Sequence, residues 1–344
     1  MMLFKTFKKG VWIIGIVLFT AILLAPPGNA APQPVRLKFA SMSVGGNWYI
    51  YASRMAAIMQ KYLPEGSSID VSPESGGVGN PMMVSNNQAQ LAISFGPVQS
   101  WAWNGTVAYV ERKKKFQDIR ALIGGINEPD IHKNAVMAQA SLGIKSLQEV
   151  KDKKMKLRVV TDRTAALGGY VSAIICREYG FTFDDITSWG GNVTRLTRDQ
   201  AIPLIQDRRA DLALYVVGQR QPDVVELAMN ADLKFLPISA EIQKTLMKEY
   251  GFSATNVHKD EFKGVDTEVR TIGLPTGVIV NKNLPDEIVY LMMKALAENV
   301  KEIQASHSSV KHFDPSKGWE PSLNGNVPLH PGAAKFYKEK GWMK

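Results

Sequence analysis

The stretch Glu74-Ser75-Gly76-Gly77-Val78-Gly79-Asn80-Pro81, followed by the segment up to Phe95, decides how the fold is interpreted. Three glycines in four positions allow backbone angles that other residues avoid, so the chain can turn sharply and approach a ligand closely. We expect Asn80 to be a helix N-cap and Pro81 the first helical residue. Backbone N–H groups and the positive end of a helix dipole would then meet at one spot, which favours a carboxylate or phosphate. The alternative is a glycine turn that only links a strand to a helix.

Three predicted strands each end in a glycine-bearing turn that opens a helix. Residues 35–39 alternate between apolar and polar side chains, residues 69–71 form a second short strand, and residues 91–95 form an apolar run. The turns that follow contain Gly45, Gly76 and Gly96. Parallel sheets bind ligands at the carboxyl ends of their strands, so we expect these turns to share one edge of a sheet.

A second unit of similar α/β design follows. The expected strands are residues 135–138, 157–160, 211–216 and 278–280. The turn at residues 161–169 opens a helix that should stop at Gly180. Near the end of the chain, Pro285 begins a long helix whose apolar face extends to Ile303.

The N-terminus has the features of an export signal. Lys5, Lys8 and Lys9 precede an apolar run from Val11 to Leu24, and small residues ending at Ala30 follow. Residues 1–30 are therefore the expected signal peptide, and the mature protein is expected to be periplasmic. An uncleaved anchor is the alternative, but the run is shorter than the ~20 apolar residues that span a bilayer. No cysteine stands beside the cleavage site, which argues against a lipoprotein.

Composition agrees with a globular export product. The net charge is +9, of which about +6 stays with the mature chain. Its roughly 310 residues are enough for two lobes of ~100–200 residues each. The basic runs at 112–115 and 151–156 are expected to be solvated loops, so we expect no nucleic-acid partner. Cys176 is the only cysteine and lies in an apolar helical context, where a buried structural thiol is expected.

Several short fragments stand in order along nearly all of the mature chain. They are Gly45-Gly46-Asn47-Trp48-Tyr49, Glu74-Ser75-Gly76-Gly77-Val78-Gly79-Asn80, Trp103-Asn104-Gly105, Ile144-Lys145-Ser146-Leu147, residues 211–215, Leu284-Pro285-Asp286-Glu287 and residues 328–337. Together they resemble solute receptors of the TAXI type, the extracytoplasmic binding proteins of tripartite (TRAP) transporters. The Pro-Leu-His-Pro-Gly-Ala stretch that begins at Pro328 is the most distinctive of them.

The resemblance implies an α/β, two-lobe periplasmic binding protein of type II with the ligand cleft between the lobes. Lobe one would comprise residues 36–128 plus 275–344, and lobe two residues 129–274. The lobes would close on a small solute, such as a glutamate-like amino acid or a dicarboxylate like 2-oxoglutarate. A micromolar affinity, about −8 kcal/mol, is the expected scale. The receptor would deliver the solute to TRAP membrane subunits as a monomer, without a cofactor or a metal.

The expected ligand-binding residues come from turns of both lobes. Backbone N–H groups at the Gly76 turn would bind an anionic group, and aromatic side chains would form apolar walls. Lobe one contributes Gly46, Asn47, Trp48, Tyr49, Ser75, Gly76, Gly77, Asn80 and Phe95, and lobe two contributes Arg163, Thr164, Ala165, Leu167, Val216 and Gln219.

Two of these assignments have alternatives. Trp48 and Tyr49 could instead pack in the core beneath the first helix. Arg163 could pair bidentately with a carboxylate of the solute, or form a surface ion pair with Asp162 or another acid. The TAXI-type receptors have a small-residue turn where this chain has Asp162-Arg163-Thr164-Ala165-Ala166, so the identity of the solute stays open.

The sequence offers little support for an enzyme or a metal-binding protein. The histidines are His132, His258, His307, His312 and His330, and their spacing does not suggest a metal site. The sequence has no nucleophile elbow, no Cys/His pairing and no Walker phosphate loop, so we expect no catalytic residues. A sensor that reports to a membrane kinase would use the same closure of two lobes, and the sequence does not separate it from a transport receptor.

Overall fold

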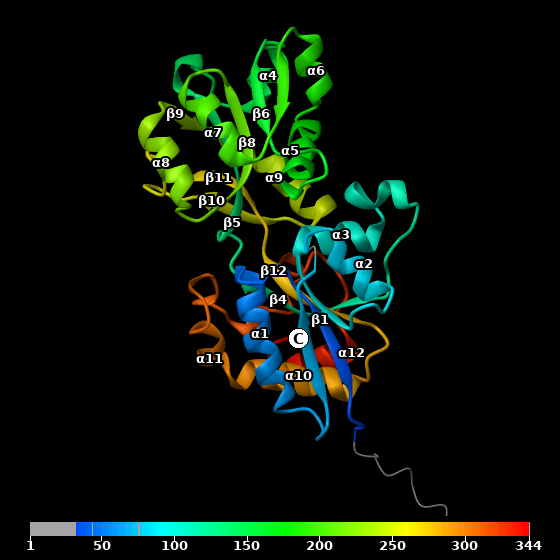
Figure 1. Ribbon diagram of the computed structural model, residues 1–344. Coiled ribbons are helices and arrows are strands. Elements are labelled where there is room, and N and C mark those ends of the chain that lie inside the picture. Colours follow the sequence, from blue (N-terminus) through cyan, green and yellow to red (C-terminus); the bar gives the residue numbers. More distant parts are fainter. Residues whose placement is uncertain (1–31, 43, 75, 344) are drawn as a thin grey trace, which may run out of the picture. The chain divides into compact units, whose positions relative to one another are not determined.

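The computed structural model describes residues 32–42, 44–74 and 76–343, which form a mixed α/β structure with two sheets (Figure 1). The expected signal peptide, residues 1–30, and the candidate Ser75 lie outside the described residues.

The first sheet has the strand order β2-β1-β3-β12-β4. Its strands are β1 (Arg36–Ala40), β2 (Ser68–Ser72), β3 (Leu91–Phe95), β4 (Ile119–Asn127) and β12 (Thr276–Asn281). β1 is parallel to β2 and β3, whereas β12 is antiparallel to β3 and β4. The strand expected at 278–280 therefore joins this sheet from a distant part of the sequence.

Helices cover both faces of the first sheet. They are α1 (Asn47–Gln60), α2 (Gly79–Ser85), α3 (Gly96–Asn104), α10 (Asp286–Glu298), α11 (Val300–Gln304) and α12 (Pro331–Glu339), with short 3-10 helices η1 (Val107–Arg112), η3 (Ser308–Val310), η4 (Pro315–Lys317) and η5 (Pro321–Leu323). In β3, Leu91 and Ile93 belong to the core beneath α1 and α10, while Ala92 belongs to the core beneath α2 and α3. Successive side chains of a strand point to opposite faces of the sheet, and here each face is covered by a hydrophobic core, so β3 is buried on both sides.

The long helix expected from Pro285 to Ile303 is two helices. α10 ends at Glu298, and Asn299 leaves the helical conformation with φ −121° and ψ 33°. The Asn299 side chain donates one hydrogen bond to the Ala295 carbonyl oxygen (2.8 Å) and one to the Tyr62 hydroxyl (3.1 Å). This local capping competes with continuation of the helix.

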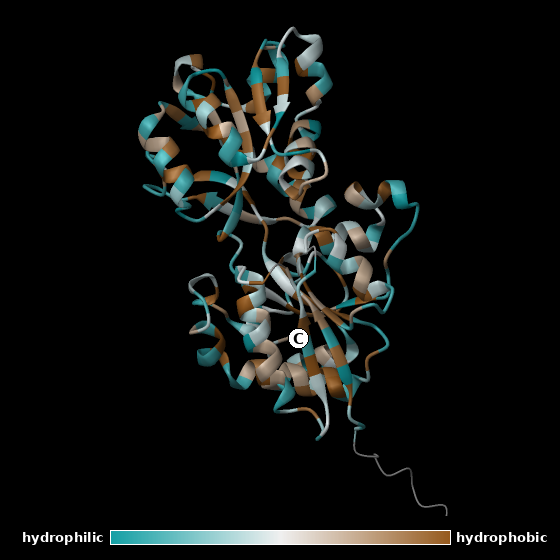
Figure 2. Ribbon diagram, viewed as in Figure 1, coloured by the Kyte–Doolittle hydropathy of each residue, from teal (hydrophilic) through white to brown (hydrophobic). Residues whose placement is uncertain are grey.

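The second sheet has the order β10-β11-β5-β8-β6-β7, and β9 also pairs with β5. Its strands are β5 (His132–Gln139), β6 (Arg158–Thr161), β7 (Asn192–Arg195), β8 (Leu212–Gly218), β9 (Leu233–Phe235), β10 (Ser253–Val257) and β11 (Val269–Gly273). The accompanying helices are α4 (Leu147–Asp152), α5 (Leu167–Glu178), α6 (Phe183–Ser188), α7 (Arg198–Gln206), α8 (Pro222–Asn230) and α9 (Ala240–Tyr250), with η2 at Ala140–Leu142. Hydrophobic residues lie along the strands of both sheets (Figure 2).

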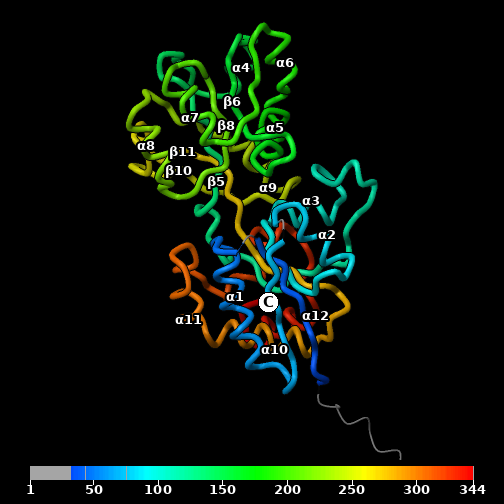
Figure 3. The backbone as a smooth tube through the Cα atoms, in the orientation of Figure 1, coloured from blue at the N-terminus to red at the C-terminus, as the bar shows by residue number. Residues whose placement is uncertain are grey.

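Two short segments connect the sheets, residues 128–131 between β4 and β5 and residues 274–275 between β11 and β12 (Figure 3). The side chain of Trp101 in α3 also contacts residues of the part of the chain that carries the second sheet. The Trp101 indole N–H donates to the Tyr250 carbonyl oxygen (3.1 Å), and its ring lies 6.0 Å from that of Phe252 and 6.3 Å from that of Tyr170.

The distinctive stretch from Pro328 has a structural role. His330 is fully buried at the N-cap of α12, where its Nδ1 accepts the Gly332 N–H (3.2 Å). The His330 backbone N–H donates to the Ala121 carbonyl oxygen of β4 (2.9 Å). This segment therefore fixes α12 against the first sheet.

Candidate functional site

The carboxyl ends of β1, β2 and β3 lie side by side at one edge of the first sheet. β1 pairs in parallel with both neighbours, and the three strands end at Ala40, Ser72 and Phe95. α1 begins at Asn47 after the first turn, and α3 begins at Gly96 directly after β3. The prediction that the three glycine-bearing turns share one edge is therefore confirmed.

The turn at Gly76 and Gly77 needs glycine for two different reasons. Both residues have positive φ, 59° and 44°, which side chains disfavour. A Cβ at Gly76 would also collide with the side chain of Met42, whereas a Cβ at Gly77 would meet no atom within 4 Å. The Gly76 turn is thus packed directly against the segment that follows β1.

Asn80 supports this turn from inside the protein. The expectation that it caps a helix is wrong, because α2 begins two residues earlier than expected, at Gly79, with Val78 as its N-cap and Pro81 as its third residue. Asn80 is fully buried, and its Nδ2 donates to the carbonyl oxygens of Ser41 (3.2 Å) and Ile93 (2.8 Å). The Asn80 amide N–H groups therefore join the segment after β1 to β3, while its Oδ1, the atom that a cap would use, is buried without a partner among the described residues.

The aromatic candidates of the first sheet form one stack. Trp48 is 4% exposed and packs on Phe95, with ring centroids 4.7 Å apart. This is the core packing that was the alternative for Trp48, while Tyr49 and Phe95 are half-buried. Asn47 is exposed, and Gly46 is the N-cap of α1 without a side-chain capping bond. The N-terminal turn of α1 is therefore open to its surroundings.

The candidates on the turn after β6 are mostly exposed. Arg163, Thr164 and Ala165 are exposed, and α5 begins at Leu167, which is half-buried. The Asp162 carboxylate accepts the backbone N–H of Arg163 (2.8 Å). Within the described residues the Arg163 guanidinium has no carboxylate partner, so the surface ion pair that was the alternative for this residue is not formed there.

The remaining candidates lie near the end of β8. β6 and β8 are parallel neighbours, so the turn after Thr161 and the end of β8 at Gly218 share an edge of the second sheet. Val216 and Leu167 are partly buried against the same hydrophobic core as Phe95. That core contains side chains from both sheets, so candidates from the two sheets border a common apolar region.

A polar cavity of about 500 Å³ has walls from both sheets, and we call it the bridging cavity. It is lined by Asn47, Ile131, His132, Gly218, Gln219, Gln221, Pro222, His307, Ser308, Ser309 and Lys311. Asn47 and Gln219 are the two expected residues among them. The structure thus brings the start of α1 and the segment after β8 to one cavity, together with η3, which sequence analysis did not single out.

His132 is the lining residue with an unusual environment. Its Nδ1 is buried without a hydrogen-bond partner among the described residues, and the edge of its ring meets Phe95 at a centroid distance of 5.6 Å. Burial lowers the pKa of His132 to about 4, so the imidazole is neutral near pH 7. No sequence signal marked this histidine, because its position at the start of β5 matters only after the sheets are assembled.

Gln219 is held in place by a hydrogen-bonded network. Its Nε2 donates to Asp130 Oδ2 (3.0 Å), in the segment that connects β4 to β5. The same oxygen lies 3.3 Å from His258 Nε2, and His258 Nδ1 lies 2.9 Å from Glu268. The Asp130 carboxylate therefore faces this network rather than the bridging cavity.

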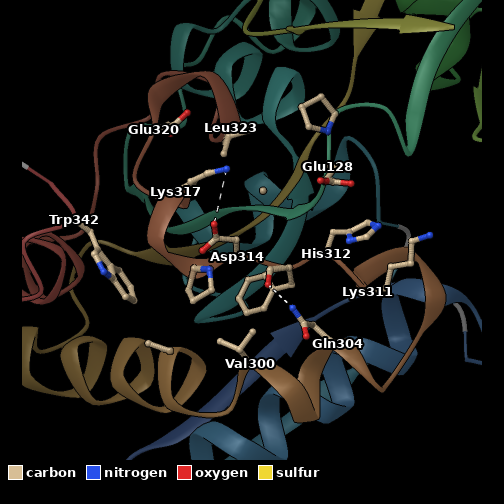
Figure 4. A pocket seen from close by; sticks show the side chains of 15 residues that line it. Glu128, Val300, Gln304, Lys311, His312, Asp314, Lys317, Glu320, Leu323 and Trp342 are labelled. Atoms are coloured by element: carbon tan, nitrogen blue, oxygen red, sulfur yellow. Dashed lines mark hydrogen bonds and ion pairs between the residues drawn. The ribbon is translucent and has the colours of Figure 1, made fainter. Parts of the chain in front are cut away.

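A larger hollow of about 710 Å³ lies beside α10, α11 and the 3-10 helices of the C-terminal region (Figure 4). Its charged side chains have both signs: Lys317 lies 3.9 Å from Asp314, and Glu128 and Glu320 also line it. It contains no wall from the second sheet beyond the connecting segment at Pro129. A ligand there would not contact both sheets, so this hollow is a weaker candidate than the bridging cavity.

Comparison with known proteins places the chain in a family. The profile of the NMT1-like family matches residues 39–341, which is most of the sequence. The chain belongs to the NMT1-like family. Among solved structures, a TctC solute-binding protein from Polaromonas is 15% identical, with a TM-score of 0.51, over 90% of this chain and 98% of that one.

Two further structures are more distant from this NMT1-like chain. MatC from Rhodopseudomonas palustris, solved with bound malate, is 12% identical, with a TM-score of 0.47, over 89% of this chain and 99% of that one. The periplasmic aliphatic sulphonate-binding protein SsuA from Escherichia coli is 12% identical, with a TM-score of 0.45, over 89% and 79%. The NMT1-like chain thus has the two-lobe α/β fold of periplasmic solute-binding proteins, as expected.

Two chemical features of the NMT1-like chain complete the description. Cys176 is buried, and burial raises the pKa of its thiol to about 12, so it is not a thiolate at neutral pH. Among residues 32–42, 44–74 and 76–343, no group of three acidic, cysteine or histidine side chains is placed to hold a metal, and no helix has the length and apolarity to span a bilayer.

Proposed function

We propose that this chain is a TAXI-type receptor that captures a small organic anion or amino acid, similar to glutamate or 2-oxoglutarate, and delivers it to the membrane subunits of a TRAP transporter. The proposed lobes are residues 36–128 plus 275–344 and residues 129–274. The observation that carries this proposal is the bridging cavity, because its walls come from both sheets. Its volume of about 500 Å³ falls in the ~300–1,000 Å³ range of small-molecule sites.

Binding between two lobes supplies the signal that a transporter needs. A solute that touches both lobes stabilises the closed state by its differential affinity for that state. The connecting segments, residues 128–131 and 274–275, are the positions where the backbone could absorb such a movement. Membrane subunits could then distinguish loaded from empty receptor.

We infer that the chain carries out no reaction on its solute. The Cys176 thiol is buried and protonated, and the neutral His132 has no nucleophilic side chain as a hydrogen-bond partner among the described residues. Export by a signal peptide cleaved near Ala30, action in the periplasm as a monomer, and ligand contacts by the remaining turn residues are further parts of the proposal.

Mass spectrometry of the small molecule that co-purifies with the protein tests this function directly. We expect a carboxylate or an amino acid that is recovered unchanged after incubation. Added back at 100 times its Kd, it should stabilise the protein by about 2.7 kcal/mol in a thermal-shift assay. Conversion of the compound by the protein, or failure of any amino acid or organic anion to bind, would contradict the proposal.

A further inference from the structure

We propose that the bridging cavity is the subsite for a carboxylate group of the solute, contacted by the Lys311 ammonium group, the first turn of α1 and the His132 imidazole. This inference rests on the proposed solute-receptor function and specifies where, and with which groups, the anionic part of the solute is held.

The charge of the cavity lining is one-sided. Lys311 is its cationic side chain, and no Asp or Glu belongs to the lining. Lys311 is exposed, and its ammonium group has no hydrogen bond or ion pair within the described part of the chain. Two carboxylates adjoin lining residues along the chain, and both are engaged: Asp130 by Gln219 and His258, and Asp223 by Arg198. A carboxylate in the cavity would therefore find an unpaired cation and no opposing acid.

The start of α1 adds donors on the opposite wall. α1 is 14 residues long, and its N-cap Gly46 provides no side-chain hydrogen bond. The first helical hydrogen bond joins the Ile50 N–H to the Gly46 carbonyl oxygen (3.1 Å), so the N–H groups of residues 47–49 have no helical partner. Asn47 lines the cavity at this turn, where the helix dipole favours negative charge.

His132 places a further polar group beside the cavity. Its Nδ1 is buried without a partner, and neither ring nitrogen has a hydrogen bond among the described residues. Because Nδ1 has no exposed surface, Nε2 is the nitrogen that a molecule in the cavity can reach. A neutral imidazole with Nε2 protonated can donate to a carboxylate without adding a second charge.

The polar residues of η3 complete the wall on the side of the first sheet. Ser308 and Ser309 line the cavity, and Ser309 is held by His307, whose Nδ1 accepts the Ser309 N–H (3.1 Å). The Ser309 carbonyl oxygen accepts a hydrogen bond from Asn127 Nδ2 (3.1 Å), which fixes η3 to the end of β4. The position of Lys311, two residues later, is thereby tied to the point where the chain leaves the first sheet.

The test uses the full chain and isothermal titration with 2-oxoglutarate and succinate, and with succinamide as an uncharged probe of matched shape. We expect the wild-type protein to bind at least one dicarboxylate and to bind succinamide much more weakly. Lys311→Gln should weaken dicarboxylate binding by about 10-fold or more, since a hydrogen bond to a charged group contributes roughly 1.5–3 kcal/mol. Lys317→Gln is the matched control, because Lys317 is exposed and lines the larger hollow, as Lys311 also does, but does not line the bridging cavity. It should change affinity less than about twofold.

A second readout does not depend on affinity. In protein labelled with ¹⁵N histidine, the His132 imidazole signals, assigned with His132→Phe, should move when the dicarboxylate is added. Unchanged dicarboxylate affinity in Lys311→Gln together with unmoved His132 signals would overturn the subsite, while the proposed receptor function would stand. Preference for succinamide, or a co-purified solute without an anionic group, would overturn it too. If no solute binds or co-purifies, the receptor function itself fails, and the subsite fails with it.

Discussion

Replacing Asn80 tests how the edge of the first sheet at the carboxyl ends of β1 and β3 is built. In Asn80→Ala the carbonyl oxygens of Ser41 and Ile93 lose their shared donor in a fully buried position. An unsatisfied buried acceptor costs about 1–3 kcal/mol, and the lost amide atoms leave a small void. We therefore expect the free energy of unfolding to fall by about 2–4 kcal/mol.

Asn80→Asp separates hydrogen bonding from packing, because the two side chains have nearly the same shape. A carboxylate would face two carbonyl oxygens without a donor, so at pH 7 the loss should be at least as large as in Asn80→Ala. Burial would raise the pKa of the new carboxyl group in the folded state. The unfolded state then releases its proton first as the pH rises, so Asn80→Asp should be less stable at pH 8 than at pH 5, relative to the wild-type protein.

Urea unfolding followed by tryptophan fluorescence measures these differences. With a slope of about 2–3 kcal/mol/M, the midpoint should shift by about 1 M. Asn230→Ala is the control, because Asn230 is exposed at the end of α8 and should change stability by less than about 0.5 kcal/mol. A midpoint for Asn80→Ala equal to that of the control, or an Asn80→Asp variant without extra pH dependence, would refute the assignment of these hydrogen bonds.

Three further predictions use the same unfolding measurement. Gly76→Ala should lower the free energy of unfolding by about 2–4 kcal/mol, and Gly77→Ala by only about 1 kcal/mol. Both substitutions put a side chain at a positive φ, but only the one at Gly76 creates a collision. Equal effects would contradict the packing of this turn. Lys133→Met should destabilise by about 3–5 kcal/mol by leaving the Glu261 carboxylate buried and unpaired, and adding Glu261→Gln should recover part of the loss. Because the pKa of His132 is about 4 in the folded state, the unfolded state binds the proton first as the pH falls. The free energy of unfolding should therefore fall by about 1–3 kcal/mol between pH 6.5 and pH 4 through this group. A His132→Gln variant with the same pH dependence as the wild-type protein would contradict this.

The sequence was sufficient for the edge of the first sheet because the decisive signals are local. A glycine that must adopt positive φ, such as Gly76, stands shortly after the short strand that ends at Ser72, and this order along the chain already predicts a strand, a turn and a helix. The parallel pairing of β1 with both β2 and β3 then follows from the repeated pattern. Local chemistry and sheet topology agree at this edge, which is why the prediction was confirmed.

The errors occur where a residue's partner is distant in sequence. Asn80 has the local features of an N-cap, but it lies inside α2, and its amide donates to the carbonyl oxygens of Ser41 and Ile93, contacts that only the paired sheet reveals. In the same way, Asn299 ends α10 through a hydrogen bond to the hydroxyl of Tyr62, 237 residues earlier. Local propensity does not contain such contacts, so sequence analysis assigned a cap and a continuous helix instead.

His132 and Lys311 were not predicted as site residues for a related reason. Neither belongs to a periodic pattern or a glycine turn, and they are 179 positions apart in the sequence. They line one cavity because residues 128–131 lead the chain from β4 into the second sheet beside η3. A cavity assembled from a connecting segment, a 3-10 helix and two helix starts has no local sequence signature.

In the proposed closure of the two lobes, the connection between the sheets would give this cavity one fixed wall and one moving wall. Asn127, the last residue of β4, accepts hydrogen bonds from the hydroxyls of Tyr51 in α1 and Thr276 in β12, and donates to the Ser309 carbonyl oxygen in η3. These buried bonds hold α1 and η3 together at the point where both connecting segments begin. Residues 128–131 and 274–275 lie just outside the cluster, so a backbone rotation there would move Gly218–Pro222 against a fixed Asn47 and Lys311. A carboxylate held on the fixed wall would favour the closed state if it gains contacts with the moving wall on closure. Such a preference for the closed state is what a receptor needs in order to signal that it is occupied.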